Sequence, residues 1–254
     1  MADTETIWCE RGGVDGPLLM LLHGLGANGT VWHGMKPFLE QHWHGRWLIP
    51  DLRGHGRSFH RAPYGFGIHA SDVAALLEQD EEVTLIGHSM GGVIAFALAT
   101  GMFGLRVKRV FAFGVKVDWT EAEIVKAKAI SQTPPKLFAT KAEAVERHLK
   151  VSGLWGLVAP DSAEAETGIR AVNGGFRLAA DPMTYALGKP DIVRIAQTAD
   201  APVNLLCGEL DNVANPDSMR RLGADVTVLS GLGHSPHVEA PGTFWQAIAG
   251  QCQP

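Results

Sequence analysis

The chain alternates between short apolar runs and segments whose apolar positions follow a helical period. Seven apolar runs, each ended by glycine or a polar turn, predict strands at 6–10, 17–24, 47–54, 83–89, 109–115, 203–209 and 226–231. Several of them have almost no polar alternation, which is typical of strands buried on both faces of a parallel sheet. The first two flank a glycine-rich turn at 11–16, so we expect them to pair as neighbouring strands.

Segments with helical patterning separate these runs. Residues 69–79 place Val73, Leu76 and Leu77 on one face, and residues 90–100 form an apolar segment of helical length. Residues 241–252 begin with proline and are typical of a terminal helix. Strands that alternate with helices predict a doubly wound α/β layer architecture.

Residues 116–190 interrupt this alternation. Three segments there, 119–130, 141–154 and 162–172, have helical patterning, and none reads as a convincing strand. We interpret 116–190 as a helical cap inserted in a core made of residues 1–115 and 191–254. The alternative is one more set of helices that cover the sheet.

The charges of this region are uneven along the sequence. Residues 126–150 carry six Lys and Arg side chains against two acids, a balance of +4, and Asp161, Glu164 and Glu166 follow soon after. Charge runs of this kind usually lie on solvated faces, and we interpret them so.

The amino-acid composition narrows the classes of protein to which the chain could belong. The 254 residues are 46% hydrophobic and 19% charged with a net charge of -5, which favours one globular domain and argues against nucleic acid as the main partner. Three widely spaced cysteines suggest neither a disulfide framework nor a zinc site. The N-terminus has no apolar signal core and no run reaches membrane-spanning length. We therefore expect a soluble, cytoplasmic protein with no membrane association.

A single serine lies among glycines after the apolar run at 83–86. In "GHSMGG" (87–92), Ser89 has a glycine two positions before it and two after it, and the helical segment follows at once. A serine at such a strand-to-helix turn is exposed in a strained conformation, and the glycines leave the space that the turn needs. Ser89 is therefore the candidate nucleophile, with a purely structural turn as the alternative. We expect the neighbouring His88 to pack beside the site and not to act as the base.

A serine nucleophile needs a base, and histidine can accept and return a proton near neutral pH. His234 directly follows the last predicted strand, whereas His237, three residues later, is better explained by loop packing. The acid that orients the histidine should precede it on another loop. Asp211 lies on the loop after the run at 203–209 and fits this role, with Glu209 as the second choice and an Asx turn as the structural alternative.

The negative oxygen that forms during attack needs backbone donors. Met90, at the start of the helix after Ser89, should supply one amide, because a helix N-terminus favours negative charge. Leu25, in the glycine-rich turn after the strand at 17–24, should supply the other. His23, in the same turn, is expected to be a buried, hydrogen-bonded structural residue.

Taken together, these motifs resemble those of the α/β-hydrolase superfamily, in which serine, acid and histidine follow in this order. The resemblance is carried by "HGLGAN" (23–28), "DLRGHGRS" (51–58), "GHSMGG" (87–92), "GELD" (208–211) and "GLGHSPHVEAP" (231–241). It implies an α/β fold with a mostly parallel central sheet, helices on both faces and an inserted helical cap. It also implies that 51–58 is a structural turn, so Asp51, His55 and Ser58 are left out of the site.

The resulting hypothesis is a serine hydrolase, specifically a carboxylesterase for small to medium, largely apolar esters. It would work through an acyl-enzyme, with no metal or organic cofactor. A lactonase, a carbon–carbon bond hydrolase or a cofactor-free perhydrolase on the same triad remain alternatives, as does a non-enzymatic small-molecule-binding member of the fold. The oligomeric state stays open. Candidates to line an apolar pocket beneath the cap, with cap packing as the alternative, are Trp119, Phe138, Trp155, Met183 and Tyr185.

Overall fold

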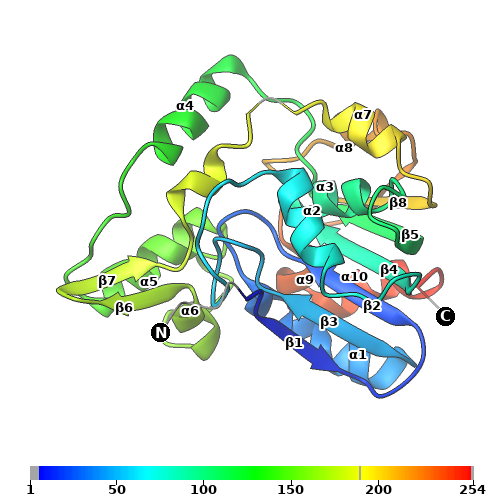
Figure 1. Ribbon diagram of the computed structural model, residues 1–254, viewed down its shortest axis with the longest axis horizontal. Helices are drawn as coiled ribbons and strands as arrows, with labels where there is room; N and C mark the ends of the chain where they lie inside the picture. The colour runs from blue at the N-terminus through cyan, green and yellow to red at the C-terminus, as the bar shows by residue number, and fades with distance from the viewer. Residues whose placement is uncertain (1–5, 189, 253–254) are drawn as a thin grey trace.

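A seven-stranded sheet forms the centre of the structure, a computed structural model that describes residues 6–188 and 190–252 (Figure 1). Its strands lie in the order β1-β3-β2-β4-β5-β8-β9, and β6 and β7 form a separate two-stranded sheet. The strand bounds are β1 (Cys9–Gly12), β2 (Leu18–Leu22), β3 (Arg46–Pro50), β4 (Glu82–His88), β5 (Arg106–Phe113), β6 (Ile169–Val172), β7 (Gly175–Leu178), β8 (Val203–Gly208) and β9 (Val226–Leu229).

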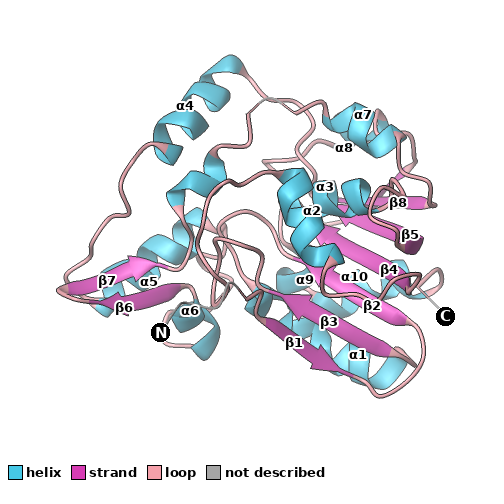
Figure 2. Cartoon of the chain, viewed as in Figure 1, coloured by secondary structure: helices cyan, strands magenta, loops and turns pink. Residues whose placement is uncertain are grey.

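Helices cover both faces of the large sheet (Figure 2). The α-helix bounds are α1 (Lys36–His42), α2 (Phe66–Ala74), α3 (Met90–Leu98), α4 (Glu121–Ser131), α5 (Lys141–Val151), α6 (Ala163–Thr167), α7 (Ile192–Gln197), α8 (Pro216–Arg220), α9 (Pro236–Glu239) and α10 (Pro241–Ala249). Two 3-10 helices are η1 (Gly29–Met35) and η2 (Pro182–Tyr185). Within the described residues, no helix is both long and apolar enough to cross a bilayer.

The uninterrupted apolar runs follow from burial on two sides. All five residues of β2 are buried, and they alternate between two separate cores. Leu18, Met20 and Leu22 pack in the core shared with α2, α3, α7 and α8. Leu19 and Leu21 pack in the other core, with η1, α1 and α10. A strand between two helical layers has no solvated face, so polar alternation is absent.

All neighbouring strands of the large sheet run parallel except β1 and β3. The carboxyl ends of β2, β4, β5 and β8 therefore meet along one edge of the sheet. After β2 the chain continues to β3 on one side and returns to β4 on the other. In open α/β sheets, ligands bind outside the carboxyl ends near such a reversal of strand order.

The expected pairing of the first two strands is wrong. β1 begins at Cys9, enters the expected turn, and pairs antiparallel with β3 instead of β2. β2 lies between β3 and β4, with parallel pairing on both edges, so no edge is left for β1.

The expectation that residues 116–190 hold only helices is also wrong in one part. The segment 162–172 is helical only at α6, and residues 169–178 form the β6–β7 hairpin. Val172 pairs with Gly175 across a two-residue turn at Asn173 and Gly174, a dipeptide that favours hairpins. The boundaries of a cap at 116–190 and of a core at 1–115 and 191–254 stay predictions, and residues 1–5, 189 and 253–254 of these ranges lie outside the described residues.

Candidate active site

Ser89 lies at the sharp turn between β4 and α3. Its backbone has φ 50° and ψ -112°, a left-handed conformation that side chains rarely adopt and that costs on the order of 1–3 kcal/mol. The Ser89 amide donates to the Phe113 carbonyl oxygen at 2.8 Å, which holds the turn against the end of β5. Ser89 is partly exposed at the carboxyl edge of the sheet.

Glycines make this turn possible. A Cβ on Gly87 would lie 2.4 Å from the Gly91 carbonyl oxygen, and a Cβ on Gly91 would lie 2.3 Å from the Leu22 carbonyl oxygen. A Cβ on Gly92 would lie 2.7 Å from Val115 Cγ2, so this glycine lets α3 approach the sheet. The steric reason inferred from the sequence for Gly87 and Gly91 agrees with this packing.

Asp211 and His234 come together from two loops. Asp211 follows β8, and its Oδ2 accepts a hydrogen bond from His234 Nδ1 at 2.9 Å. The Asp211 side chain is fully buried, and its Oδ1 accepts from the amides of Val213 and Ala214 at 2.7 and 2.9 Å. Burial opposes ionisation of Asp211, but the bonds from His234 and from these amides outweigh it and lower the pKa of the carboxyl.

The His234 ring also lies beside the turn that carries Ser89. A Cβ on Gly114, the residue after β5, would lie 3.1 Å from His234 Cε1. The buried His88 ring has its centroid 4.6 Å from that of His234, and His88 Nε2 donates to the His234 carbonyl oxygen at 2.9 Å. His88 thus packs beside the site, as expected. Among the described residues, Ser89 Oγ makes no hydrogen bond to His234; such bonds are often long before substrate binds.

Glu209 and His237, the alternatives to Asp211 and His234, take no part in the hydrogen bonds of this pair. Glu209 is exposed, and its Oε2 accepts from the Ser230 hydroxyl and from the Gly231 amide, both at 2.8 Å. His237 is buried in α9, where burial and the nearby His234 lower its pKa to about 3. Within the described residues, no hydrogen bond joins either residue to Asp211, so neither replaces its partner in the Asp211–His234 pair.

Two backbone amides lie close to the turn that carries Ser89. Met90 is the first residue of α3, where helix amides have no partner within the helix. Leu25 follows Gly24, and a Cβ on Gly24 would lie 3.4 Å from Ser89 Cβ, so this loop packs directly against the turn. Within residues 6–188 and 190–252, neither the Leu25 amide nor the Met90 amide donates to a protein acceptor.

Residues of the segment 51–58 form hydrogen bonds that hold neighbouring loops in place. Asp51 is fully buried and accepts from the Gly29 and Arg57 amides, both at 2.7 Å. His55 Nε2 accepts from the Gly26 amide, and His23 Nε2 accepts from the Leu52 amide at 2.9 Å. These bonds fix the shape of the loop that carries Leu25.

A cavity of about 680 Å³ lies over that loop, between α4, α5, β7 and η2. Leu25 forms part of its wall, together with Trp119, Phe138 and Tyr185, three of the five pocket candidates. The other two, Trp155 and Met183, are about half exposed and do not line it. Three cations, Lys126, Lys136 and Arg147, line the cavity too. They belong to the basic run at 126–150, whose pattern in the sequence does not indicate a pocket.

Comparison with known proteins identifies the family. The profile of the alpha/beta hydrolase family matches residues 19–247, nearly the whole chain. The chain belongs to the alpha/beta hydrolase family.

The curated relatives of this hydrolase include esterases and a lipase. It is 26% identical to the pimeloyl-[acyl-carrier protein] methyl ester esterase of Pectobacterium atrosepticum over 91% of this chain and 92% of that protein. It is 34% identical to the lipase LipV of Mycobacterium tuberculosis over 62% of this chain and 59% of LipV. Uncharacterized proteins of Mycobacterium bovis and M. tuberculosis are 40% identical over 87 residues, and the match spans only a quarter of their length.

Solved structures with a similar fold include esterases and a thioesterase domain. The thioesterase domain from the curacin biosynthetic pathway superposes on this hydrolase with a TM-score of 0.75, 21% identity and coverage of 95% and 94% of the two chains. A marine microorganism esterase superposes with a TM-score of 0.69, 21% identity and coverage of 96% and 98%. These likenesses establish the α/β-hydrolase fold with its mostly parallel sheet.

Proposed function

We propose that this hydrolase is a serine carboxylesterase for small to medium, largely apolar esters, with Ser89, His234 and Asp211 as its catalytic triad. The observation that carries the proposal is the hydrogen bond between the buried Asp211 carboxylate and the partly exposed His234 ring, which lies beside the strained turn of Ser89. The esterase and lipase relatives support the same reaction class.

In the proposed mechanism, Ser89 Oγ attacks the ester carbonyl carbon while His234 Nε2 takes the hydroxyl proton. Asp211 accepts the hydrogen bond of His234 Nδ1, which keeps Nε2 free as the base and stabilises the charged ring. The amides of Leu25 and Met90 hold the tetrahedral oxyanion. His234 then protonates the leaving alcohol, and a water activated by the same ring releases the acid from Ser89.

The first prediction tests the nucleophile. Ser89→Ala should lower kcat on short p-nitrophenyl esters by on the order of 10⁴-fold or more, because no other group can form the acyl-enzyme. Wild-type protein should also react at Ser89 with a fluorophosphonate probe, identified by mass spectrometry.

Ser71→Ala is the matched control, because Ser71 is exposed on α2. It should leave both readouts unchanged. Equal turnover by folded Ser89→Ala and wild-type protein would refute the triad. An unlabelled Ser89 in a protein without turnover would favour a binding function instead.

A further inference from the structure

The cavity over the Leu25 loop has an apolar interior next to the proposed oxyanion site. Besides Leu25, its wall includes Val151 at the end of α5 and Tyr185 of η2. A Cβ on Gly26 would lie 3.4 Å from the Val151 carbonyl oxygen and 3.6 Å from the Tyr185 hydroxyl, so both residues pack onto this loop. A chain attached to a carbonyl carbon at Ser89 would therefore extend into this space.

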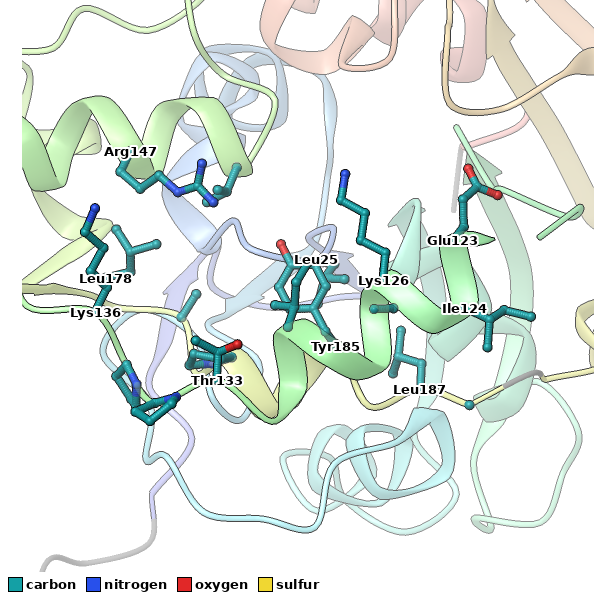
Figure 3. A pocket seen from close by; sticks show the side chains of 18 of the residues that line it. Leu25, Glu123, Ile124, Lys126, Thr133, Lys136, Arg147, Leu178, Tyr185 and Leu187 are labelled. Carbon is teal, nitrogen blue, oxygen red and sulfur yellow. The ribbon is translucent and has the colours of Figure 1, made fainter. Parts of the chain in front are cut away.

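Three cations surround the apolar surface. Lys126 comes from α4, Arg147 from α5, and Lys136 from the segment between the two helices. In the view of Figure 3, Arg147 and Lys136 lie on one side of Tyr185 and Lys126 lies on the other. All three are exposed, so they stand at the mouth of the cavity. In the part of the chain that the structure describes, none of them forms a salt bridge.

The carboxylates near these cations form hydrogen bonds or ion pairs with other residues. Glu123, the one acidic residue among the described lining residues, accepts from Lys116 Nζ at 2.6 Å and from the Thr120 amide at 2.9 Å. A second groove, which Lys136 and Arg147 also line, contains Glu143 and Glu146. Glu146 is paired with Lys150, and Glu143 closes the capping box of α5. Glu143 keeps its negative charge but does not line the cavity, and Glu123 is paired with Lys116. The three cations therefore leave the mouth of the cavity with a net positive charge.

An apolar chain with a negatively charged far end would complement both features. Apolar pocket walls hold the chain, while a few placed polar groups fix the orientation of the ligand. An arginine guanidinium can bind a carboxylate through two parallel hydrogen bonds, and a lysine adds a point charge. We propose that Lys126, Lys136 and Arg147 select esters whose chain ends in a carboxylate, remote from the bond that Ser89 cleaves. This inference rests on the proposed function for the position of the scissile bond.

The experiment compares two p-nitrophenyl esters with an acyl chain of about eight carbons, which a cavity of this size accommodates. One chain ends in a carboxylate and the other in the isosteric primary carboxamide. The measured quantity is the ratio of their kcat/KM values. Wild type should prefer the carboxylate by roughly tenfold at low salt, and the preference should shrink as salt screens the exposed charges.

The variants Lys126→Gln, Lys136→Gln and Arg147→Gln should each lower this ratio about twofold, within the range for exposed ion pairs. The triple variant should bring it close to one. Lys128→Gln is the matched control, because Lys128 is exposed on α4 like Lys126 but does not line the cavity. The ratio should not change in this variant. The inference would be overturned if the triple variant kept the wild-type preference for the carboxylate ester. It would also be overturned if Lys128→Gln lowered the ratio as much as the substitutions of the lining cations.

Failure of the inference can be told apart from failure of the proposed function. If wild type hydrolyses both esters equally and Ser89→Ala hydrolyses neither, the esterase stands and carboxylate selection is wrong. If no ester is hydrolysed, calorimetric titration of both esters into Ser89→Ala protein decides the inference. Tighter binding of the carboxylate ester, weakened by the three added substitutions, would support it. Equal affinity, or no binding of either ester, would overturn it.

Discussion

At the scale of single residues, the carboxylates of Asp211 and Glu209 have opposite surroundings. Its carboxylate is buried and accepts hydrogen bonds from His234 and from two amides, whereas Glu209, two residues earlier, faces solvent. The lowered pKa of Asp211 means that it stays ionised at neutral pH in spite of burial. In the proposed triad, this charge holds the histidine tautomer that leaves Nε2 free.

Asp211→Asn should therefore lower kcat by on the order of 10⁴-fold, because the amide no longer fixes that tautomer. Circular dichroism should show a folded protein, since an asparagine side chain can still accept bonds from the Val213 and Ala214 amides. Glu209→Gln, as the matched control, should change kcat by less than about twofold. A folded Asp211→Asn protein with nearly full activity would remove Asp211 from the triad.

At the scale of elements, the helices α3 and α4 differ most clearly in burial. All nine residues of α3 are buried, and the helix packs against β4, β5, α2 and α7. α4 has no buried residue and packs mainly against η2, and Figure 1 shows it away from the large sheet. Local stability follows the buried apolar contacts that a segment makes, so α4 should open more readily than α3.

Hydrogen exchange followed by mass spectrometry checks this difference. Amides of α4 should exchange at least about tenfold faster than those of α3, which should exchange only with global unfolding. Thr120→Ala removes the capping box of α4 and should speed exchange of α4 further, because such caps stabilise helices by about 1 kcal/mol. Equal protection of the two helices would show that α4 is held by contacts beyond those described.

The sequence predicted the buried strands well because a strand covered on both faces shows an unbroken apolar run. β1 has no buried residue, and its partner is set by which sheet edge remains open, which no local pattern records. The β6–β7 hairpin did have a signal, the Asn173-Gly174 turn, but the helical pattern of the preceding residues obscured it. The contact between Asp211 and His234 agrees with the motifs, and the catalytic roles of Ser89, Asp211 and His234 stay predictions. The position of the cavity cations depends on the packing of α4 against η2, which no local motif records.

At the scale of the whole molecule, buried histidines connect folding to pH. His69, His148 and His237 are at most 2% exposed, and each has at least one ring nitrogen without a hydrogen-bond partner among the described residues. Burial lowers the pKa to about 4 for His69 and for His148, and burial together with His234 lowers it to about 3 for His237. An unfolded histidine titrates near pH 6.5. Between about pH 6.5 and about pH 4, the unfolded chain therefore binds more protons than the folded protein.

Stability should consequently fall as the pH is lowered through this window. From about pH 7.5 to about pH 5.5, each of the three histidines should reduce the free energy of unfolding by on the order of 1 kcal/mol, measured by urea denaturation. His148→Met removes one of these titrating rings. The free energy of unfolding of this variant should therefore fall by about 1 kcal/mol less than that of wild type over the same pH range. His44→Gln changes an exposed histidine and should leave the drop as in wild type. A free energy of unfolding that stays level or rises on acidification would contradict the prediction, because it would mean that these rings take up protons in the folded protein as well. If the free energy of unfolding of His148→Met falls as much as that of wild type, His148 does not contribute to the loss of stability.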